Sequence, residues 1–472
     1  MVCAVIALLA QLNAVDRLIT EGNRLQSDQL FPEADSVYGE AIRKAQAWGS
    51  ETHFVALAAN NRGAVRYRAG QYADALTDYQ NAHRIWLQLG RAGDAAKAAT
   101  NLAELYHARG DDAAALRWSE LALTTGDTSV AALTIHGNTL RSVGRLPESL
   151  KVLNAAVARE SGGRNKLLSL PLAYALLGRA QTQLSLGLLD EADQSATWAK
   201  EILVTFRGPD SLAVSRVLLQ QAHIARLRGD ANQAERWLRE VLRVQQQGLP
   251  DGHPQMAPTM VELAELLAAR QRFAEAEKLA QRAAVLVRQG LGESHPDYAG
   301  LLLSMADLYR GQRKFDDAER YYRDAITHAR TAGIETQARF ASYLNNYAAL
   351  LVDQDRFSEA EPLFRQALAH RERFLGAAHF QNAELLFNLA VVTMAGRRWT
   401  EAEALVERSL ALKQQVVGNE HASLTPSLKL YGQLLLRNGK KKRAQDVARL
   451  YAKIEAGQPG RAVNWQSLRS FR

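Results

Sequence analysis

The sequence is poor in cysteine and proline. Its one cysteine, Cys3, excludes an internal disulfide framework and any zinc site built from cysteines. Only 11 of the 472 residues are proline and 31 are glycine, and the body of the chain has no apolar run long enough to cross a membrane. With 47% apolar and 23% charged residues, the composition is that of a helix-rich globular protein rather than a disordered one.

The chain also lacks a strong excess of one charge. The 58 basic and 50 acidic residues leave a net charge of +8, which describes a mixed surface. Binding along a phosphate backbone requires a clustered basic stripe. The one dense basic cluster, residues 440–443, falls in a turn between helices, and we interpret it as solvated. We therefore expect no nucleic-acid partner.

Motifs that carry chemistry are missing as well. The sequence contains no glycine-rich phosphate loop, no nucleophile elbow and no histidine pair at metal spacing. The eleven histidines are scattered, and no βαβ pattern of a catalytic domain occurs. We predict that the protein is not an enzyme and that it binds no cofactor and no metal.

What the chain does contain is a repeat, marked by two small residues twelve positions apart. The first small residues are Gly22, Gly63, Ala103, Gly137, Ala180, Ala222, Ala264, Ala306, Ala348, Ala390 and Gly432. The second small residues are Ala34, Ala75, Ala115, Ser149, Ala192, Ala234, Ala276, Ala318, Ala360, Ala402 and Ala444. From Ala180 onward the spacing is 42 residues six times in succession, and before it the units run at 41, 40, 34 and 43. Eleven ordered matches predict eleven repeats.

Each repeat has the pattern of a helical hairpin. Apolar residues recur at helical spacing, and no alternating strand pattern competes. A small residue at both positions lets the two helices of a hairpin touch, because a larger side chain would push the backbones apart. Three residues before the second small residue an aromatic residue often stands, and we expect it to cap the hairpin core: Phe31, Tyr72, Phe273, Phe315, Phe357 and Trp399.

This pattern resembles the tetratricopeptide repeat family. Asn101–Tyr106 is similar to the first helix of that family's unit, and Arg356–Glu361 is similar to its turn and second helix. The 42-residue units resemble the kinesin-light-chain-like subgroup, whose units open with His-Pro as His253-Pro254 and His295-Pro296 do. The resemblance covers about residues 15 to 455 and implies an all-α, right-handed superhelical solenoid of about eleven helix-turn-helix repeats. HEAT-type repeats have a similar period but do not predict the twelve-residue pair.

The repeat lengths suggest four segments. Residues 1–14 are an apolar N-terminal segment, residues 15–165 hold repeats of variable length, residues 166–455 hold the 42-residue repeats, and residues 456–472 form a basic tail that we expect to be mobile. The apolar segment is either a signal sequence without its usual basic flank or the start of the first helix. We expect a cytoplasmic protein, or a periplasmic or secreted one if the segment is a signal.

Asparagines mark the candidate binding groove. Stacked hairpins place their first helices on the concave face, which solenoids use for binding. In peptide-binding members of the family, an Asn two positions before the first small residue holds the ligand's backbone, and Asn61, Asn101, Asn346 and Asn388 occupy that position. The other repeats lack Asn there, which predicts two partial grooves rather than one. The alternative is that these amides bond neighbouring repeats or water.

Polar residues that follow the first small residue by one to five positions should also face inward. The groove candidates of this kind are Arg68, Glu104, Asn138, Arg141, Asp307 and Arg310, and His107, His223, Arg226 and Glu265 stand at similar positions. Their charges alternate, so they do not predict one ligand charge. Arg68 with Asn101 and Arg141 is the nearest approach to a carboxylate clamp, although a solvated arginine is the commoner case.

The sequence thus predicts a non-enzymatic scaffold that binds a partner peptide or helix in the concave groove. An alternative, suggested by the apolar start, is a secreted or periplasmic assembly factor of an envelope complex. Binding of nucleic acid is a third and weaker hypothesis. The sequence does not name the partner protein.

Overall fold

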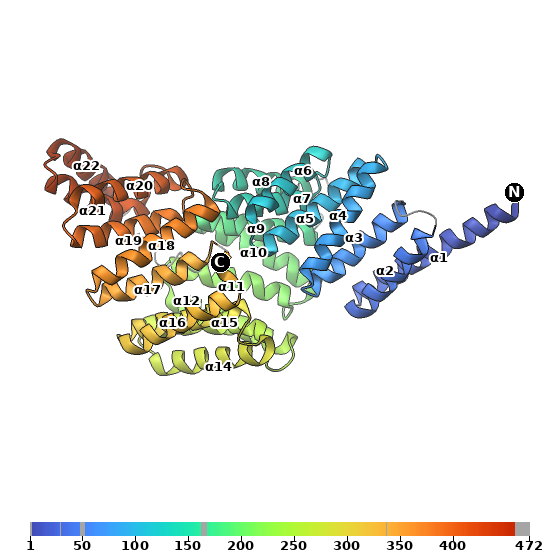
Figure 1. The fold of residues 1–472 in the computed structure, drawn as a ribbon, viewed down its shortest axis with the longest axis horizontal. Helices are drawn as coiled ribbons and strands as arrows, with labels where there is room; N and C mark the ends of the chain where they lie inside the picture. The colour runs from blue at the N-terminus through green and yellow to red at the C-terminus, as the bar shows by residue number, and fades with distance from the viewer. Residues whose placement is uncertain (1, 29, 48–51, 162–167, 337, 458–472) are drawn as a thin grey trace. The chain divides into compact units, whose positions relative to one another are not determined.

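The computed structural model describes residues 2–28, 30–47, 52–161, 168–336 and 338–457 (Figure 1). Within these ranges the backbone forms 22 α-helices and three short 3-10 helices and no strand. The all-α prediction is confirmed. The predicted basic tail lies, from residue 458 on, outside the described residues.

The helices alternate between the first and the second helix of a hairpin. The first helices are α1 (Val2–Ser27), α3 (His53–Arg68), α5 (Ala92–Ala108), α7 (Val130–Ser142), α9 (Leu170–Ser185), α11 (Leu212–Leu227), α13 (Ala257–Ala269), α15 (Pro296–Gly311), α17 (Phe340–Asp353), α19 (Asn382–Ala395) and α21 (Thr425–Arg437). The second helices are α2 (Phe31–Gln46), α4 (Tyr72–Gln88), α6 (Asp112–Thr125), α8 (Leu146–Ser161), α10 (Leu189–Arg207), α12 (Ala231–Gly248), α14 (Phe273–Leu291), α16 (Phe315–Thr331), α18 (Phe357–Leu375), α20 (Trp399–Val417) and α22 (Lys441–Gly457). The 3-10 helices η1 (Pro254–Met256), η2 (Ile334–Thr336) and η3 (Ala422–Leu424) precede α13, α17 and α21.

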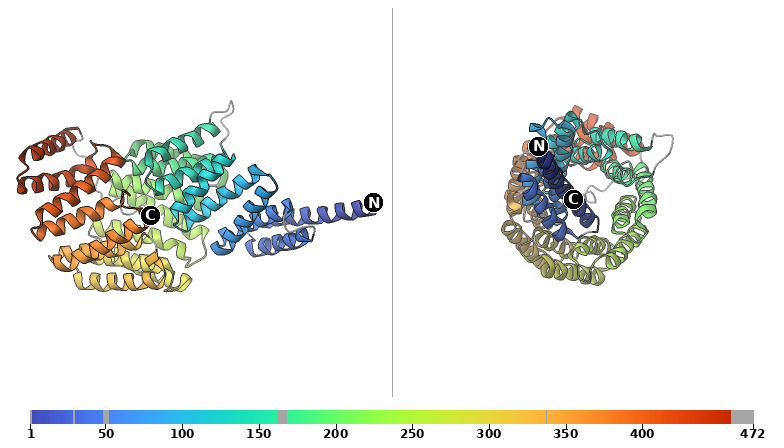
Figure 2. Two further views of the ribbon diagram at one scale, coloured as in Figure 1. Left: turned by 45° about the horizontal axis from the view of Figure 1, so that its top comes forward. Right: turned by 90° about the vertical axis from the view of Figure 1, so that its right-hand side faces the viewer.

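The chain divides into two compact units, Met1–Arg179 and Ala180–Arg472. In the second unit one apolar cluster has members from Ala222 to Leu412, as expected of stacked repeats. Figure 2 shows the helices of this unit from two further directions. The change of repeat length at residue 165 does not coincide with this division, and the four predicted segments stay a prediction. Residues 2–14 belong to α1. Among the described helices none is long and apolar enough to span a membrane.

The small residues lie where the two helices of a hairpin cross. The second small residues are buried throughout, and so are the first ones except Gly432 in the last hairpin. In one hairpin the two are joined directly, because Ser149 Oγ donates to Gly137 O at 2.7 Å. A Cβ added at Gly137 would lie 2.5 Å from Leu153, and one added at Gly22 would lie 2.6 Å from Tyr38. At Gly22 and Gly137, glycine therefore leaves room for the large side chain that the second helix presents one turn beyond its own small residue.

The turn inside each hairpin has a fixed backbone conformation. The residue five positions before the second small residue has a positive φ in every hairpin for which it is described. It is glycine at Gly70, Gly110, Gly144, Gly187, Gly229 and Gly439, and it is not glycine at Gln271, Arg313, Asp355 and Arg397. The aromatic residues expected to cap the hairpin core begin the second helix rather than lie in the turn, since α2, α4, α14, α16, α18 and α20 each start on one.

Ion pairs join successive second helices at a spacing of 37 residues. A basic residue in the turn of one hairpin contacts the glutamate that follows the second small residue of the preceding hairpin. The pairs are Arg272 with Glu235 (2.9 Å), Arg356 with Glu319 (2.7 Å), Arg398 with Glu361, and Lys440 with Glu403 (2.8 Å). Residue 440 of the basic cluster thus takes part in an ion pair, whereas the sequence analysis interpreted that cluster as solvated.

Histidines cap the entry to several first helices. The Nδ1 atoms of His253, His295, His379 and His421 each accept a hydrogen bond from the backbone N–H two residues later, at 3.1 to 3.3 Å. The expectation that the histidines are scattered is wrong for these four, which recur at multiples of 42 residues. As expected, proline is the first residue of η1 and of α15.

Candidate binding face

The first helices meet one another on one side of each unit. In the first unit α1 contacts α3, α3 contacts α5 and α5 contacts α7; in the second unit α13, α15, α17 and α19 form a similar series. Among the described residues, no two second helices approach each other as extensively. The first helices therefore line the inner face of each unit, where the sequence analysis placed the groove.

Side chains on this face pair in a regular register. The residue two positions before the first small residue bonds to the residue one position after the first small residue of the preceding repeat. The pairs of this kind are Asn61 with Asn23, Glu262 with His223, Ser304 with Glu265, and Asn346 with Asp307. The same register thus recurs in both units.

In the first unit these bonds extend into a run of amides. Asn101 Nδ2 donates to Asn60 Oδ1 at 2.9 Å, Asn60 Nδ2 to Asn61 Oδ1 at 3.5 Å, and Asn61 Nδ2 to Asn23 Oδ1 at 3.0 Å. The hydroxyl of Tyr38, which packs under Gly22, donates to the same Asn23 oxygen at 2.6 Å. We call this set the N-terminal run.

The second unit contains the same arrangement. Asn388 Nδ2 donates to Asn345 Oδ1 at 2.9 Å, Asn345 Nδ2 to Asn346 Oδ1 at 3.1 Å, and Asn346 Nδ2 to Asp307 Oδ2 at 2.9 Å. Tyr322 donates to Asp307 Oδ1 at 2.5 Å. This C-terminal run differs from the other chiefly in ending on a carboxylate where the N-terminal run ends on an amide.

The carboxylate of Asp307 changes the electrostatics of the inner face around it. Burial, together with the negative charges of Asp307 and Glu262, raises the pKa of Glu265 from 4.5 to about 7. Burial and Asp307 also raise the pKa of Tyr322 well above its usual value. At Tyr38, beside the neutral Asn23, burial raises the pKa to about 12. The inner face of the second unit therefore carries a carboxyl group whose pKa is near neutral.

The other predicted groove residues lie in different surroundings. Arg310 Nε donates to Asp353 Oδ2 at 2.5 Å, beside the C-terminal run. Asn138 and Arg141 lie on α7, between the two runs in sequence, and Asn138 Oδ1 and Arg141 Nε are both buried without a hydrogen-bond partner among the described residues. Arg68 and Glu104 are exposed.

The structure does not gather the candidates into one carboxylate clamp. Asn101 turns to Asn60 in the N-terminal run, and Arg68 is exposed at the end of α3. Instead, the amides serve contacts between repeats, the alternative that the sequence analysis left open. The role of all ten candidates in binding a ligand stays a prediction.

Sequence reasoning missed the residues that complete the two runs. Asn60 and Asn345 each precede a predicted asparagine, so the Asn-Asn pair was a signal that could have been found. Ala64 and Ala349 follow the first small residue in these two repeats and have no polar group. Each following asparagine, Asn101 or Asn388, therefore bonds to the amide one turn earlier.

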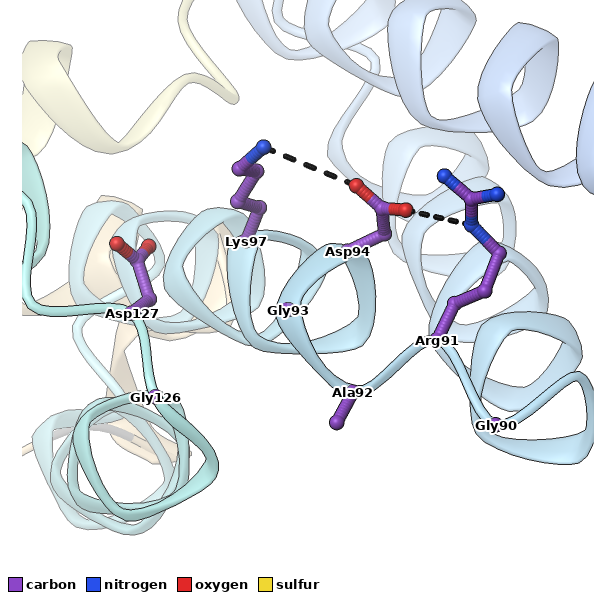
Figure 3. Close-up of a pocket in the computed structure, with 8 residues that line it drawn as sticks. All are labelled: Gly90, Arg91, Ala92, Gly93, Asp94, Lys97, Gly126 and Asp127. Atoms are coloured by element: carbon purple, nitrogen blue, oxygen red, sulfur yellow. Dashed lines mark hydrogen bonds and ion pairs between the residues drawn. The ribbon is translucent and has the colours of Figure 1, made fainter.

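A shallow depression of about 470 Å³ lies at the start of α5 in the first unit (Figure 3). Residues 90–94, Lys97, Gly126 and Asp127 line it. Figure 3 shows Lys97 and Arg91 both directed at Asp94, and the bond from Arg91 measures 2.7 Å. Its basic groups are thus already neutralised. In the described parts of the chain, no group of three or more His, Cys, Asp or Glu side chains could hold a metal ion.

Comparison with known proteins places the repeats in a family. Models described as tetratricopeptide repeat match residues 54–125, 216–255, 255–331, 339–398 and 383–454, together more than half of the chain. No curated protein matches it. A similar solved structure is BtubC (BKLC) from P. vanneervenii, with 23% identity over 52% of this chain and 92% of that one, and a TM-score of 0.42. Another is a Podosopora anserina putative kinesin light chain with nearly identical TPR-like repeats, with 18% identity over 41% and 96% and a TM-score of 0.35.

Proposed function

The chain belongs to the tetratricopeptide repeat family, as its sequence predicted, and from that premise we propose that it is a non-enzymatic scaffold for protein–protein interaction. Its inner faces bind an extended segment or a helix of a partner protein. The family and the all-helical repeat architecture support the coarse statement, a protein-binding repeat protein. The inner face as the place of binding is the finer part of the proposal.

The observation that carries this proposal is the register of the inner face. In several first helices, side chains two positions before, one after and four after the first small residue lie on the side where first helices meet. Where hydrogen bonds between repeats fix these side chains, a partner would meet a rigid polar surface. Such preorganisation reduces the entropy that binding loses.

The proposal is tested by photo-crosslinking from positions that make no polar contact. Ala64 in the first unit and Ala349 in the second stand one position after the first small residue and are only partly buried. A benzophenone amino acid at either position reports on the inner face without removing a hydrogen bond. Gln80 on α4 and Arg320 on α16 are exposed positions on second helices and serve as matched controls.

Purified variants are irradiated in lysate of the native host, and the crosslinked proteins are identified by mass spectrometry. We expect the same partner to be captured from Ala64 or Ala349 and not from Gln80 or Arg320. Capture only from the second-helix positions would place binding on the outer face. A turnover product formed from a captured small molecule would contradict the non-enzymatic part.

A further inference from the structure

Arginine occupies the same position in three first helices. Arg141 in α7, Arg226 in α11 and Arg310 in α15 each stand four residues after the first small residue. Arg310 donates a hydrogen bond to Asp353 on α17. The positive charge of Arg226 attracts the carboxyl group of Glu265 on α13 and acts to lower its pKa. In both cases the carboxylate comes from the next first helix. An arginine at this position is thus balanced by the following repeat.

Arg141 lacks such a partner. The next first helix, α9, contains neither Asp nor Glu anywhere in Leu170–Ser185. No hydrogen bond or ion pair joins Arg141 to any residue that the structure describes, and its Nε is buried. Asp112 attracts it from the first turn of α6, but that carboxylate is already hydrogen-bonded to His107 at 2.9 Å and to Ser142. A largely desolvated guanidinium without its own carboxylate is unfavourable for the folded state.

Asn138 adds a second donor beside Arg141. It stands one turn earlier on α7, and its Oδ1 is pressed against Gly178, where an added Cβ would lie 2.6 Å from that oxygen. Because the amide is planar, its NH₂ group points away from Gly178. Residues three apart on a helix are neighbours on one face. The amide of Asn138 and the guanidinium of Arg141 therefore form a pair of hydrogen-bond donors.

We propose that Arg141, with Asn138 beside it, binds a carboxylate of the partner segment, which takes the place of the acidic residue that α9 lacks. A guanidinium and a carboxylate match each other in a bidentate geometry. One singly charged carboxylate balances the one unpaired cation, whereas a phosphate dianion beside Asp112 would call for more basic side chains. The inference rests on the proposed function, because it names the chemistry of one contact on the same face.

The position predicts opposite effects on stability for two equivalent arginines. Burial lowers the pKa of Arg141 against the attraction of Asp112. At Arg310 burial also acts to lower the pKa, but the bond to Asp353 and the nearby negative groups together raise it. Replacing an unpaired buried charge by an apolar group is neutral or stabilising, and breaking an ion pair such as that of Arg310 with Asp353, whose side chains are 20% and 39% exposed, is destabilising. We expect Arg141→Met to keep or raise the melting temperature and Arg310→Met to lower it by roughly 2–4 °C.

The test is selection of a random dodecapeptide phage library on the full chain. We expect the aligned binders to share one position with Asp or Glu, or a free carboxyl terminus. Replacing that acid by its amide should weaken binding to the wild type roughly tenfold or more, as expected for a charge-assisted hydrogen bond. The same replacement should change binding to Arg141→Met less than about threefold, because the partner of the acid is already gone.

Two further variants keep the test decisive. Arg141→Lys keeps the positive charge but lacks the planar guanidinium, so the acid-to-amide replacement should weaken binding to it by an intermediate factor. This variant gives the answer even if Arg141→Met folds poorly. Arg145→Met, on the same hairpin but paired at the surface with Glu148, should bind like the wild type.

Each outcome decides the inference. Binders without an acidic position, or with one that Arg141→Met does not affect, overturn it and leave the scaffold function standing. A phosphoserine that improves binding at that position would assign the site to phosphopeptides instead. No enriched peptide at all, from any variant, would contradict the proposed function together with the inference.

Discussion

The N-terminal run and the C-terminal run have the same pattern of hydrogen bonds, but their central asparagines are buried to different extents. In both, an asparagine pair on one first helix is connected to an asparagine on the next first helix and to a tyrosine-bound residue on the previous one. Asn345 in the C-terminal run is 3% exposed, whereas its counterpart Asn60 is only partly buried. The comparison shows that the same residue spacing can produce partly exposed hydrogen bonds in one unit and a buried polar network in the other.

The second difference between the runs is one charge. The N-terminal run ends on Asn23 and is neutral. The C-terminal run ends on Asp307, whose negative charge helps to raise the pKa of Glu265. The carboxylate of Asp307 therefore adds to burial in raising the pKa of Glu265 on the inner face of the second unit. The two runs provide a matched pair for testing what burial and charge contribute.

The largest effect is expected from removing the central amide of each run. Asn345→Ala deletes a buried side chain that both donates and accepts, and it leaves Asn346 and Asn388 without those bonds. We expect it to cost about 2–3 kcal/mol, because buried polar groups that lose partners carry the full desolvation penalty. Asn60→Ala should cost about 1 kcal/mol, since water replaces the lost bonds.

Hydrogen exchange with mass spectrometry measures both variants locally, which suits a repeat protein that need not unfold in one step. Loss of protection should be confined to α15–α19 for Asn345→Ala and to α1–α5 for Asn60→Ala. Equal costs for the two would show that burial does not distinguish the runs.

The next effect is a pH dependence confined to the second unit. The pKa of Glu265 is raised in the folded state to about 7, so the stability it contributes is fully present below about pH 4.5 and is lost as pH rises through 7. Glu265→Gln should remove this dependence and stabilise the second unit at pH 8 by on the order of 2–3 kcal/mol.

Asp307→Asn makes the C-terminal run like the N-terminal one and should lower the pH at which this stability is lost. The readout is the difference in urea unfolding between wild type and each variant at pH 5 and pH 8. A difference that does not change with pH would show that Glu265 is already charged at pH 5.

The sequence alone was sufficient to predict the helical repeat and which residues lie where its two helices cross. The two small residues, twelve apart, predicted the hairpin crossing that Ser149 and Gly137 make, and the family followed from the same pattern. These features are local, because they depend on which residues share a helix face. The ten groove candidates were also correctly assigned to first helices.

The partners of those side chains could not be read from the sequence. Asn346 meets Asp307 and Arg310 meets Asp353 only because neighbouring first helices pack at a particular stagger. That stagger is set by three-dimensional packing of many residues, and it decides whether an amide faces another repeat or a ligand. The histidine caps, by contrast, had a sequence signal in their recurrence at multiples of 42 residues, and it was overlooked.

The outer face allows a smaller test of the regular second unit. Arg356→Gln removes the ion pair with Glu319, whose carboxylate is 17% exposed, and the one with Glu359, and it should destabilise the second unit measurably. Lys314 occupies the equivalent place one repeat earlier, where Tyr309 rather than the lysine bonds to Glu277 at 2.8 Å. Lys314→Gln should therefore cost less than about 0.5 kcal/mol in the same unfolding assay. Similar losses of stability in the two variants would mean that the ion pairs at a spacing of 37 residues do not contribute to stability.

The smallest expected effect concerns the turns, where hairpins of the second unit differ in sequence but not in conformation. The left-handed turn position is glycine in some of these hairpins, as at Gly229, and it is Gln271 with φ 61° in the next one. A side chain in this conformation costs about 1–2 kcal/mol, and glycine loses part of that gain through its freer unfolded chain. Gln271→Gly should therefore stabilise the second unit by about 0.5–1 kcal/mol, and Gly229→Ala, one repeat earlier, should destabilise it by about 1 kcal/mol. Melting curves of both variants decide the matter: destabilisation by Gln271→Gly would mean that the side chain of Gln271 makes a contact worth more than the strain of its backbone.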